Sequence, residues 1–488
     1  MKLSHSTILA GLLTTRLFAL EFAEVVAVAK GFDDPSGDAQ YKARIDLNRL
    51  VALATIPGKG DSAAVSKVLV AVLESGATST EARKYIIRAL SRLDSADAID
   101  PLVKLLAGDD ALLGEEARQA LSANDSPKAV AALEAALTTS SDKRETIGLI
   151  DSLAHRKSST SLPVIAPFFV HADPEIASAA IAASGRIGGA SAVDLLTKAN
   201  ANSKLAPTLK PSVEKALILA SSGDSKVLGD IYQSTGSEVV KLAAFISLTQ
   251  GLEAAASTSL VESALKSPDP DLRHAALAKG IEINLPSLMS SLAQSMEQMP
   301  REDRLIILAN IHLAKPEDRA EKIALAQLAS AEEDELIGAI NALGKIGSKP
   351  AFDAVLKGLG AREPRVNQAA ASALATTSYP RAESDLRAML KGEIGQDRVL
   401  AIKAMVFRQI SDGNPILIQI IQGDDADSSK EAMKTLYFTA TIDDLRTLCA
   451  AAGSTKDETA RRNLASIGSR IATRLDSDEA RNLVKGLE

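Results

Sequence analysis

The feature that most constrains this chain is a repeat. From Glu81 to the C-terminus, a helix-like stretch with small residues on its buried side recurs about every 28–35 residues. Repeats of this length form solenoids, in which each unit buries its apolar face only against its neighbours. We therefore predict units of two antiparallel helices joined by tight turns, and no run of alternating β-branched residues indicates a strand.

The clearest copy of the repeat occupies residues 260–277. Within it, residues 267–271 (SPDPD) turn the chain into a second helix, because proline is tolerated in a first helical turn and aspartate is favoured at helix starts. Residues 171–175 (HADPE) and 360–364 (GAREP) repeat this turn. The alignment predicts that the second helices begin near Glu81, Glu115, Arg144, Glu175, Pro211, Glu238, Asp271, Glu302, Asp334, Arg365, Asp397, Ser428 and Glu458.

The end of the second helix also recurs. Residues 343–347 (LGKIG) parallel residues 184–188 (SGRIG). Glycine after a helix supplies a left-handed cap without steric cost, so we expect Gly188 and Gly347 to end their helices. Leu343 is expected to lie in the seam between consecutive units.

Two of these motifs resemble a known family. The turn at residues 269–277 (DPDLRHAAL) resembles the HEAT repeat, and the Gly-Lys-Ile-Gly exit resembles its short variant in phycobilisome-lyase-type repeats. The resemblance covers residues 80–488. It implies an all-α fold, a right-handed α-α superhelix, or HEAT-like α-solenoid, of about a dozen helical hairpins. The residues that this family shares are structural, so the resemblance implies little about function.

The N-terminal segment differs from the rest of the chain. Residues 1–20 resemble a secretory signal peptide, with Lys2 ahead of an apolar stretch. We therefore expect a bacterial protein that is periplasmic or secreted. The alternative is a cytoplasmic protein in which these residues form an amphipathic helix that caps the array. The segment is too short and too interrupted to predict stable membrane insertion.

The remaining residues divide into a cap and an array. Residues 21–79 are expected to form an N-terminal helical cap of three helices, because a terminal unit has one face in water. Residues 80–488 are expected to form the repeat array, which a helix over residues 476–487 closes. The predicted cap helices cover residues 21–30, 41–55 and 62–74.

The sequence contains no coherent catalytic or metal-binding set of residues. None of the five histidines is followed by glutamate, whereas metal-binding HEAT enzymes of the deoxyhypusine hydroxylase type use His-Glu pairs. The single cysteine, Cys449, excludes a cysteine-based zinc site and is expected to be a small buried residue. His171 and His274 flank turns, where we expect surface or capping roles. We predict no catalytic residues, no cofactor and no metal.

Four arginines occur near the same place in their second helices, namely Arg83, Arg118, Arg273 and Arg461. The family resemblance implies that an arginine there contacts an acidic residue of a neighbouring repeat. These residues are therefore predicted to form a ladder of charges between units. The alternative is that they bind a partner, because second helices line the concave face in this family.

The leading functional hypothesis is a non-enzymatic scaffold that presents an extended concave surface to a protein partner. The short-repeat resemblance implies an alternative, an enzyme subunit like the bilin lyases or isomerases. A second alternative is a nucleic-acid-binding HEAT protein, but a net charge of −7 without a long basic block argues against nucleic acid as a partner. Aromatic residues make up only 3% of the chain and tryptophan is absent, so we expect a partner held by many modest contacts.

Overall fold

The computed structural model describes residues 22–486 except residues 59, 252–253 and 331, and the chain divides into two units, residues 1–251 and 252–488. The described residues form 29 α-helices and several short 3-10 helices, with no β-strand among them. The predicted fold class, an all-α solenoid of helical hairpins, is confirmed. Residues 1–20, the predicted signal peptide, lie outside the described residues.

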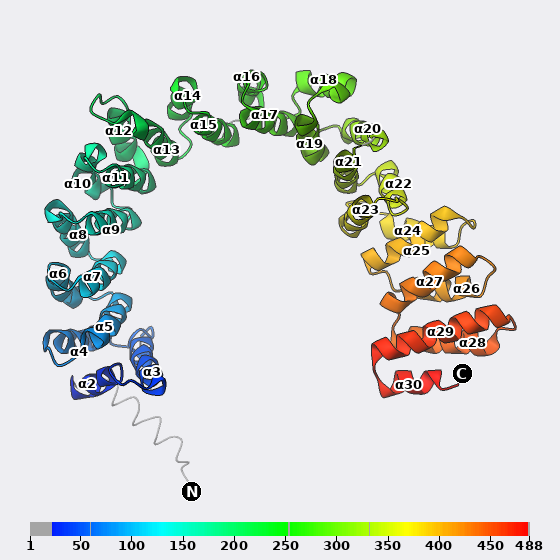
Figure 1. Cartoon of the computed structure of the whole chain (residues 1–488), viewed down its shortest axis with the longest axis horizontal. Coiled ribbons are helices and arrows are strands. Elements are labelled where there is room, and N and C mark those ends of the chain that lie inside the picture. The colour runs from blue at the N-terminus through cyan, green and yellow to red at the C-terminus, as the bar shows by residue number, and fades with distance from the viewer. Residues whose placement is uncertain (1–21, 59, 252–253, 331, 487–488) are drawn as a thin grey trace, which may run out of the picture. The chain divides into compact units, whose positions relative to one another are not determined.

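In the first unit, the first and second helices of the hairpins form two rows (Figure 1). The first helices are α2 (Phe22–Lys30), α4 (Ser62–Glu74), α6 (Ile99–Leu106), α8 (Pro127–Thr139), α10 (Leu162–Ile165), α12 (Gly189–Asn200) and α14 (Ser225–Ser234). The second helices are α3 (Gly37–Ala54), α5 (Thr80–Leu93), α7 (Ala111–Ala123), α9 (Lys143–His155), α11 (Pro174–Ile187), α13 (Lys210–Ala220) and α15 (Glu238–Gly251). Each second helix packs on the next, from α3 to α15.

The second unit repeats this pattern of two rows. Its first helices are α16 (Ala254–Ala264), α18 (Pro286–Ser295), α20 (Glu317–Ala326), α22 (Lys349–Gly358), α24 (Ala382–Leu390), α26 (Asn414–Ile421) and α28 (Ile442–Ser454). Its second helices are α17 (Pro270–Glu282), α19 (Arg301–Asn310), α21 (Glu333–Ile346), α23 (Pro364–Thr376), α25 (Gln396–Arg408), α27 (Ala426–Thr439) and α29 (Glu458–Leu475). Consecutive second helices again pack on one another, and α30 (Asp478–Val484) contacts α28 and α29 at the end of the chain.

The predicted positions of the second helices, α5 to α29 in the two units, are confirmed to within about one turn. The largest difference is at α7, which begins at Ala111 rather than near Glu115. The carboxylate of Asp110 accepts hydrogen bonds from the backbone N–H groups of Leu112 and Leu113, at 3.0 and 3.2 Å. This cap starts the helix one turn earlier than the aligned glutamate suggests.

The helix ends follow the local chemistry that the sequence predicts. Asp173 caps α11 by accepting a hydrogen bond from the Glu175 N–H at 2.8 Å, with Pro174 in the first helical position. At the other end, Gly188 has a φ of +71°, and the corresponding Gly347 after α21 has a φ of +68°. A side chain is strained at either φ, and both glycines end their helices as predicted. Only Gly347 has the predicted left-handed conformation, because the ψ of Gly188 is −172°.

A further glycine in the same motif lets the second helices approach closely. A Cβ atom on Gly344 of α21 would lie 2.8 Å from the Ala373 Cβ of α23, and one on Gly185 would lie 2.9 Å from the Ala216 Cα. Leu343, the residue before Gly344, is 0% exposed, as the prediction of a seam residue requires. We call the contact between two consecutive second helices a seam.

Candidate functional site

Arg273 joins two repeats of the second unit across the seam between α17 and α19. Its Nε lies 3.1 Å from the Asp303 Oδ2, and its Nη1 donates a hydrogen bond to the Ser267 carbonyl at 3.3 Å. The Nε2 of His274, which was expected to have a surface or capping role, lies 2.9 Å from the other oxygen of Asp303. Asp303 is 6% exposed. Arg273 therefore belongs to a contact that is built into the seam.

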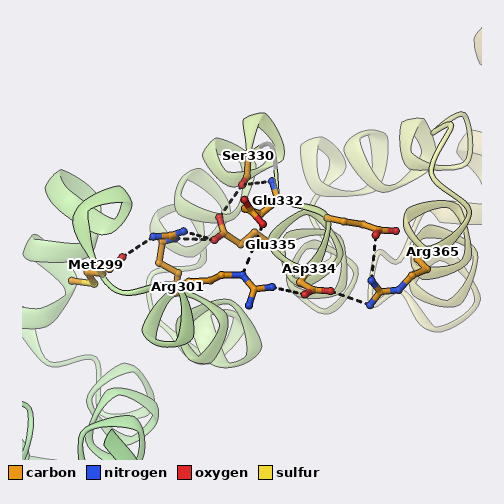
Figure 2. A network of polar contacts seen from close by, with 9 residues as sticks. Met299, Arg301, Ser330, Glu332, Asp334, Glu335 and Arg365 are labelled. Atoms are coloured by element: carbon orange, nitrogen blue, oxygen red, sulfur yellow. Dashed lines mark hydrogen bonds and ion pairs between the residues drawn. The ribbon is translucent and has the colours of Figure 1, made fainter.

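The same arrangement recurs one repeat later through Arg304, which the sequence analysis did not single out. Its Nε donates a hydrogen bond to the Glu335 Oε1 of α21 at 2.9 Å, and its Nη1 donates to the Met299 carbonyl at 2.6 Å. The other oxygen of Glu335 accepts a hydrogen bond from the Ser330 hydroxyl at 2.8 Å (Figure 2). Arg304 and Arg273 are each the fourth residue of their helix. This shared position is the signal that could have identified Arg304.

Opposing effects set the pKa of the Glu335 carboxyl, which is 2% exposed. Burial acts to raise this pKa, whereas the hydrogen bonds from Arg304 and Ser330 and the positive charges of Arg304 and Arg301 act to lower it, and the lowering effects prevail. The carboxylate is therefore ionised and paired at neutral pH. General acid catalysis needs a pKa near the working pH, so this environment suits a structural link between helices instead.

An outer layer of ion pairs lies beside this buried contact. Asp334 lies between two arginines, because it pairs with Arg301 and also accepts a hydrogen bond from the Arg365 Nη2 at 2.9 Å (Figure 2). The Nη1 of Arg365 reaches Glu333 at 3.2 Å. The hydrogen bond from Arg365 is the main cause that lowers the pKa of Asp334. These side chains are all at least partly exposed, so each pair contributes little to stability.

Arg118 also crosses a seam, in the first unit, but its acceptors there are uncharged. From α7, its Nη1 donates hydrogen bonds to the Gly148 carbonyl of α9, at 2.9 Å, and to the Ser152 hydroxyl. Its carboxylate partner is Glu115 of its own helix, with Nε 2.8 Å from Oε2. A Cβ atom at Gly148 would lie 2.9 Å from the Arg118 Nε. Because Gly148 has no side chain, there is room for the guanidinium group of Arg118.

The other two arginines make no ion pair between repeats within the described part of the chain. Arg83 is half-buried in α5, and its Nε is enclosed without a hydrogen-bond partner among the described residues. Arg461 donates a hydrogen bond to Glu458 of its own helix, at 2.6 Å. This contact lies within α29 and does not cross a seam. The structure thus places Arg118 of the first unit and Arg273 of the second unit across seams.

A different surface feature appears on α25 and α27. Phe407 and Phe438 are 39% and 63% exposed, and each follows a lysine of the same helix, Lys403 or Lys434, by one helical turn. We call these four residues the Lys–Phe surface. They line a hollow of about 370 Å³, together with Leu359, Asn367, Val406, Glu431 and Thr435.

The Lys–Phe surface can be recognised in the sequence, although the overall composition does not indicate it. Residues 403–407 (KAMVF) and 434–438 (KTLYF) occupy corresponding places in consecutive second helices. Only nine phenylalanines occur in the whole chain, so two exposed ones in one hollow are unusual for it. The low number of aromatic residues led us to expect a partner held by many modest contacts, whereas the positions of these residues identify an exposed pair.

The remaining candidates for chemistry have ordinary environments. Cys449 is partly buried rather than fully buried as expected, and burial raises the pKa of its thiol, so little reactive thiolate forms at neutral pH. His171 has the predicted capping role, because its Nδ1 accepts a hydrogen bond from the Asp173 N–H at 3.0 Å. No group of three His, Cys, Asp or Glu side chains among the described residues is arranged to hold a metal ion. None of the described helices is long and apolar enough to cross a membrane.

Comparison with known proteins gives structural likenesses of low identity. No curated protein matches the chain in sequence. The crystal structure of Kap121p aligns with a TM-score of 0.41 and 12% identity, over 98% of this chain and 58% of that chain. The karyopherin Kap121p bound to the SUMO protease Ulp1p aligns with a TM-score of 0.41 and 14% identity, over 95% of this chain and 54% of that chain. A homology model of the AP-3 complex has a TM-score of 0.40 and 14% identity, over 92% of this chain and 94% of that chain.

The chain thus spans a little more than half of the length of the Kap121p chains. These likenesses say nothing of what this chain binds. The sequence itself is more specific, because the family model of HEAT repeats matches residues 66–153 and 321–405, one stretch in each unit. The narrower likeness to phycobilisome-lyase-type repeats stays a prediction. Residues 66–153 and 321–405 therefore match HEAT repeats, and the helical hairpins and turn motifs elsewhere in the chain resemble them.

Proposed function

We propose that this chain is a non-enzymatic scaffold that binds another protein on the surface of its second helices. The observation that carries the proposal is the pair of exposed rings, Phe407 and Phe438, at corresponding positions of two consecutive repeats. Aromatic side chains at the centre of an interface often supply most of its binding energy. Covering both rings removes apolar surface from water, which favours association by about 25 cal/mol for each Å².

The charged residues of the second helices support a structural rather than a catalytic role. Arg273, Arg304 and Arg118 are each held by acceptors of the same or the next repeat. The carboxyls that face Arg304 and Arg118 have lowered pKa values because these arginines donate hydrogen bonds to them. Such carboxylates stay ionised at neutral pH and fix the geometry of the repeats.

The partner that we propose is a protein rather than a nucleic acid. The chain carries 55 lysines and arginines against 62 aspartates and glutamates, and many of its arginines are already paired with carboxylates. Nucleic-acid binding requires several unpaired cations that neutralise phosphates together. We further propose that the partner is met outside the cytoplasm, on the ground of residues 1–20 alone.

Site-specific photocrosslinking in the producing cells tests this function. A photoreactive phenylalanine analogue is placed at Phe438 or, as a matched control, at Leu219 of α13, which is 58% exposed and lies in the other unit. We expect a discrete cross-linked protein from position 438 and not from position 219. The purified partner should then bind the chain at least about tenfold more weakly after Phe407→Ser with Phe438→Ser.

Two results would contradict the proposed binding surface. One is a cross-linking pattern that is the same at both positions. The other is a partner whose affinity for the chain is unchanged by the double substitution, when circular dichroism shows that the doubly substituted chain is folded. Turnover of a small molecule by the purified chain alone would contradict the non-enzymatic part.

A further inference from the structure

The Lys–Phe surface carries information about its partner beyond the presence of two rings. Its residues come from α25 and α27, which pack on each other, so its two halves are held at a fixed spacing by the seam between them. A seam fixes backbone positions without any partner, and preorganised groups bind at a lower entropic cost. The hollow between the helices is near the lower end of the size range of ligand pockets. It suits a side chain rather than a large cofactor.

The charges around the hollow are unbalanced. Two lysines and one carboxylate, Glu431, line it. The Nζ of Lys434 lies 3.0 Å from a Glu431 oxygen, so this pair is satisfied internally. Lys403 has no ion-pair partner within the described part of the chain, and its ammonium group is available to an outside carboxylate.

Two more cations flank the hollow. Lys430 is exposed one turn before Lys434 on α27 and forms no ion pair with any described residue. On the next second helix, α29, the Arg470 guanidinium lies over the ring of Tyr437, 5.0 Å from its centroid, and has no carboxylate partner among the described residues. An apolar centre with an excess of positive charge at its edge favours a ligand with the opposite pattern.

Resting on the function proposed above, we infer that the Lys–Phe surface binds an acidic segment of the partner protein. One large apolar side chain of that segment enters the hollow between Phe407 and Phe438. Carboxylates on either side of it pair with Lys403 and with the flanking Lys430 and Arg470. The rings supply affinity, and the cations set the orientation and the preference for acidic sequence.

A single-stranded nucleic acid is the competing ligand, because bases also stack on aromatic rings beside cations. The number of available cations favours the peptide. Lys434 is already paired with Glu431, so few unpaired cations remain, whereas tight nucleic-acid binding draws on many phosphate contacts.

Fluorescence anisotropy with the full-length chain and labelled synthetic peptides tests the inference. The first peptide has leucine and phenylalanine flanked by aspartate and glutamate. A second replaces the two apolar residues by serine, and a third replaces every acidic residue by lysine. We expect the first peptide to bind at least about tenfold more tightly than either of the others. Its affinity should fall as salt concentration rises, because exposed charges are screened.

Substitutions in the chain locate the binding. Lys403→Glu with Lys434→Glu is expected to abolish the preference for the acidic peptide, and the lysine-containing peptide is expected to become the better ligand. Lys128→Glu with Lys226→Glu changes the net charge equally on exposed lysines of the first unit and should leave the preference unchanged. Phe407→Ser with Phe438→Ser should weaken the acidic peptide by at least about tenfold.

Several outcomes would overturn the inference. These are equal binding of all three peptides, an unchanged preference after the double lysine substitution, and tighter binding of a labelled single-stranded oligonucleotide than of the acidic peptide. Self-association of the chain that Phe438→Ser abolishes would assign the surface to a second copy instead. If a partner cross-links at position 438 but the chain does not prefer the acidic peptide, this inference is wrong and the proposed scaffold function still holds.

Discussion

Two seams of this molecule are each crossed by an arginine side chain, but the arginine meets different kinds of acceptor in each. Between α7 and α9, Arg118 of the first unit donates hydrogen bonds to the Gly148 carbonyl and the Ser152 hydroxyl. Between α19 and α21, Arg304 of the second unit donates to Glu335, a carboxylate that is almost fully buried. An arginine that crosses a seam therefore needs acceptors, but these need not be charged. The charge of Glu335 makes the contact across its seam sensitive to pH and costly to break, whereas the two acceptors that Arg118 meets across its own seam do not titrate in the acid range.

A third seam, between α21 and α23, rests on apolar packing, which we expect to contribute more to stability than either set of polar contacts. Leu343 of α21 is fully buried beside the close approach of Gly344 to α23. Leu343→Asp would bury a carboxylate without a partner and remove a core side chain, at an expected cost of more than about 3 kcal/mol. Hydrogen exchange of the α21 and α23 amides, followed by mass spectrometry, measures this loss locally.

A matched control sets the scale for that substitution. Lys345→Asp lies on the same helix at a position that is not buried, and we expect its effect to be within about 0.5 kcal/mol. If the amides of α21 and α23 exchanged equally fast in Leu343→Asp and Lys345→Asp, Leu343 would not belong to the apolar packing of this seam.

The second largest effect is expected from breaking the charged contact. Glu335→Ala leaves the Arg304 guanidinium without its carboxylate in a mostly buried position, and the Ser330 hydroxyl loses its acceptor. We expect a cost of about 2–3 kcal/mol, below the full penalty for a broken buried pair because Arg304 retains the Met299 carbonyl and some access to water.

The outer ion pairs give the control for Glu335. Arg365→Ala removes contacts with Asp334 and Glu333 from a residue that is largely exposed, so we expect a change below about 0.5 kcal/mol. Equal effects of Glu335→Ala and Arg365→Ala would show that burial does not separate the inner layer of this network from the outer one.

The charged seam should also respond to acid. Burial opposes ionisation of Glu335, but the hydrogen bonds from Arg304 and Ser330 prevail and hold its pKa below the ordinary value of 4.5. A carboxyl with a lowered pKa in the folded state stabilises the protein above its unfolded pKa, and this contribution is lost as the pH falls through the lowered value. We expect the wild-type chain to lose more stability than Glu335→Gln when the pH falls from about 7 to about 3.

Urea unfolding of both proteins at each pH, monitored by circular dichroism, measures this difference. The other acidic residues of the chain are the same in both proteins, so their titration cancels in the comparison. A difference between the two proteins that stays constant over the whole range would mean that Glu335 does not titrate with the stability of the fold.

Sequence and structure agree most where the determinants are local. Asp-Pro turns and glycine exits fix where helices begin and end, so the second-helix starts, the Gly347 cap and the burial of Leu343 were predictable. The partner of a seam-crossing arginine was less predictable, because it depends on the rotation of the next helix. Arg273 meets the expected carboxylate, but Arg118 meets a carbonyl and a hydroxyl, and Arg461 pairs with Glu458 of its own helix.

The surface features were missed for a different reason. The Lys–Phe surface depends on two short segments that are far apart in sequence and adjacent only after the repeats stack. The overall aromatic content gives no information on where the aromatic residues lie in the fold. Aligning the second helices residue by residue, rather than only by their turns, would have set Phe407 beside Phe438 and Arg273 beside Arg304.

Apart from the control substitutions, the smallest expected effect is in the neutral seam between α7 and α9. Ser152→Ala removes one acceptor of Arg118 but leaves the Gly148 carbonyl at 2.9 Å and the Glu115 carboxylate at 2.8 Å. The guanidinium therefore keeps most of its hydrogen bonds, and we expect a cost of at most about 1 kcal/mol in the exchange of the α7 and α9 amides. Because the serine hydroxyl does not titrate in the acid range, the difference between Ser152→Ala and the wild-type chain should be the same at neutral and at acid pH. A cost as large as that of Glu335→Ala would mean that the charge of the acceptor does not decide how much a seam depends on its arginine.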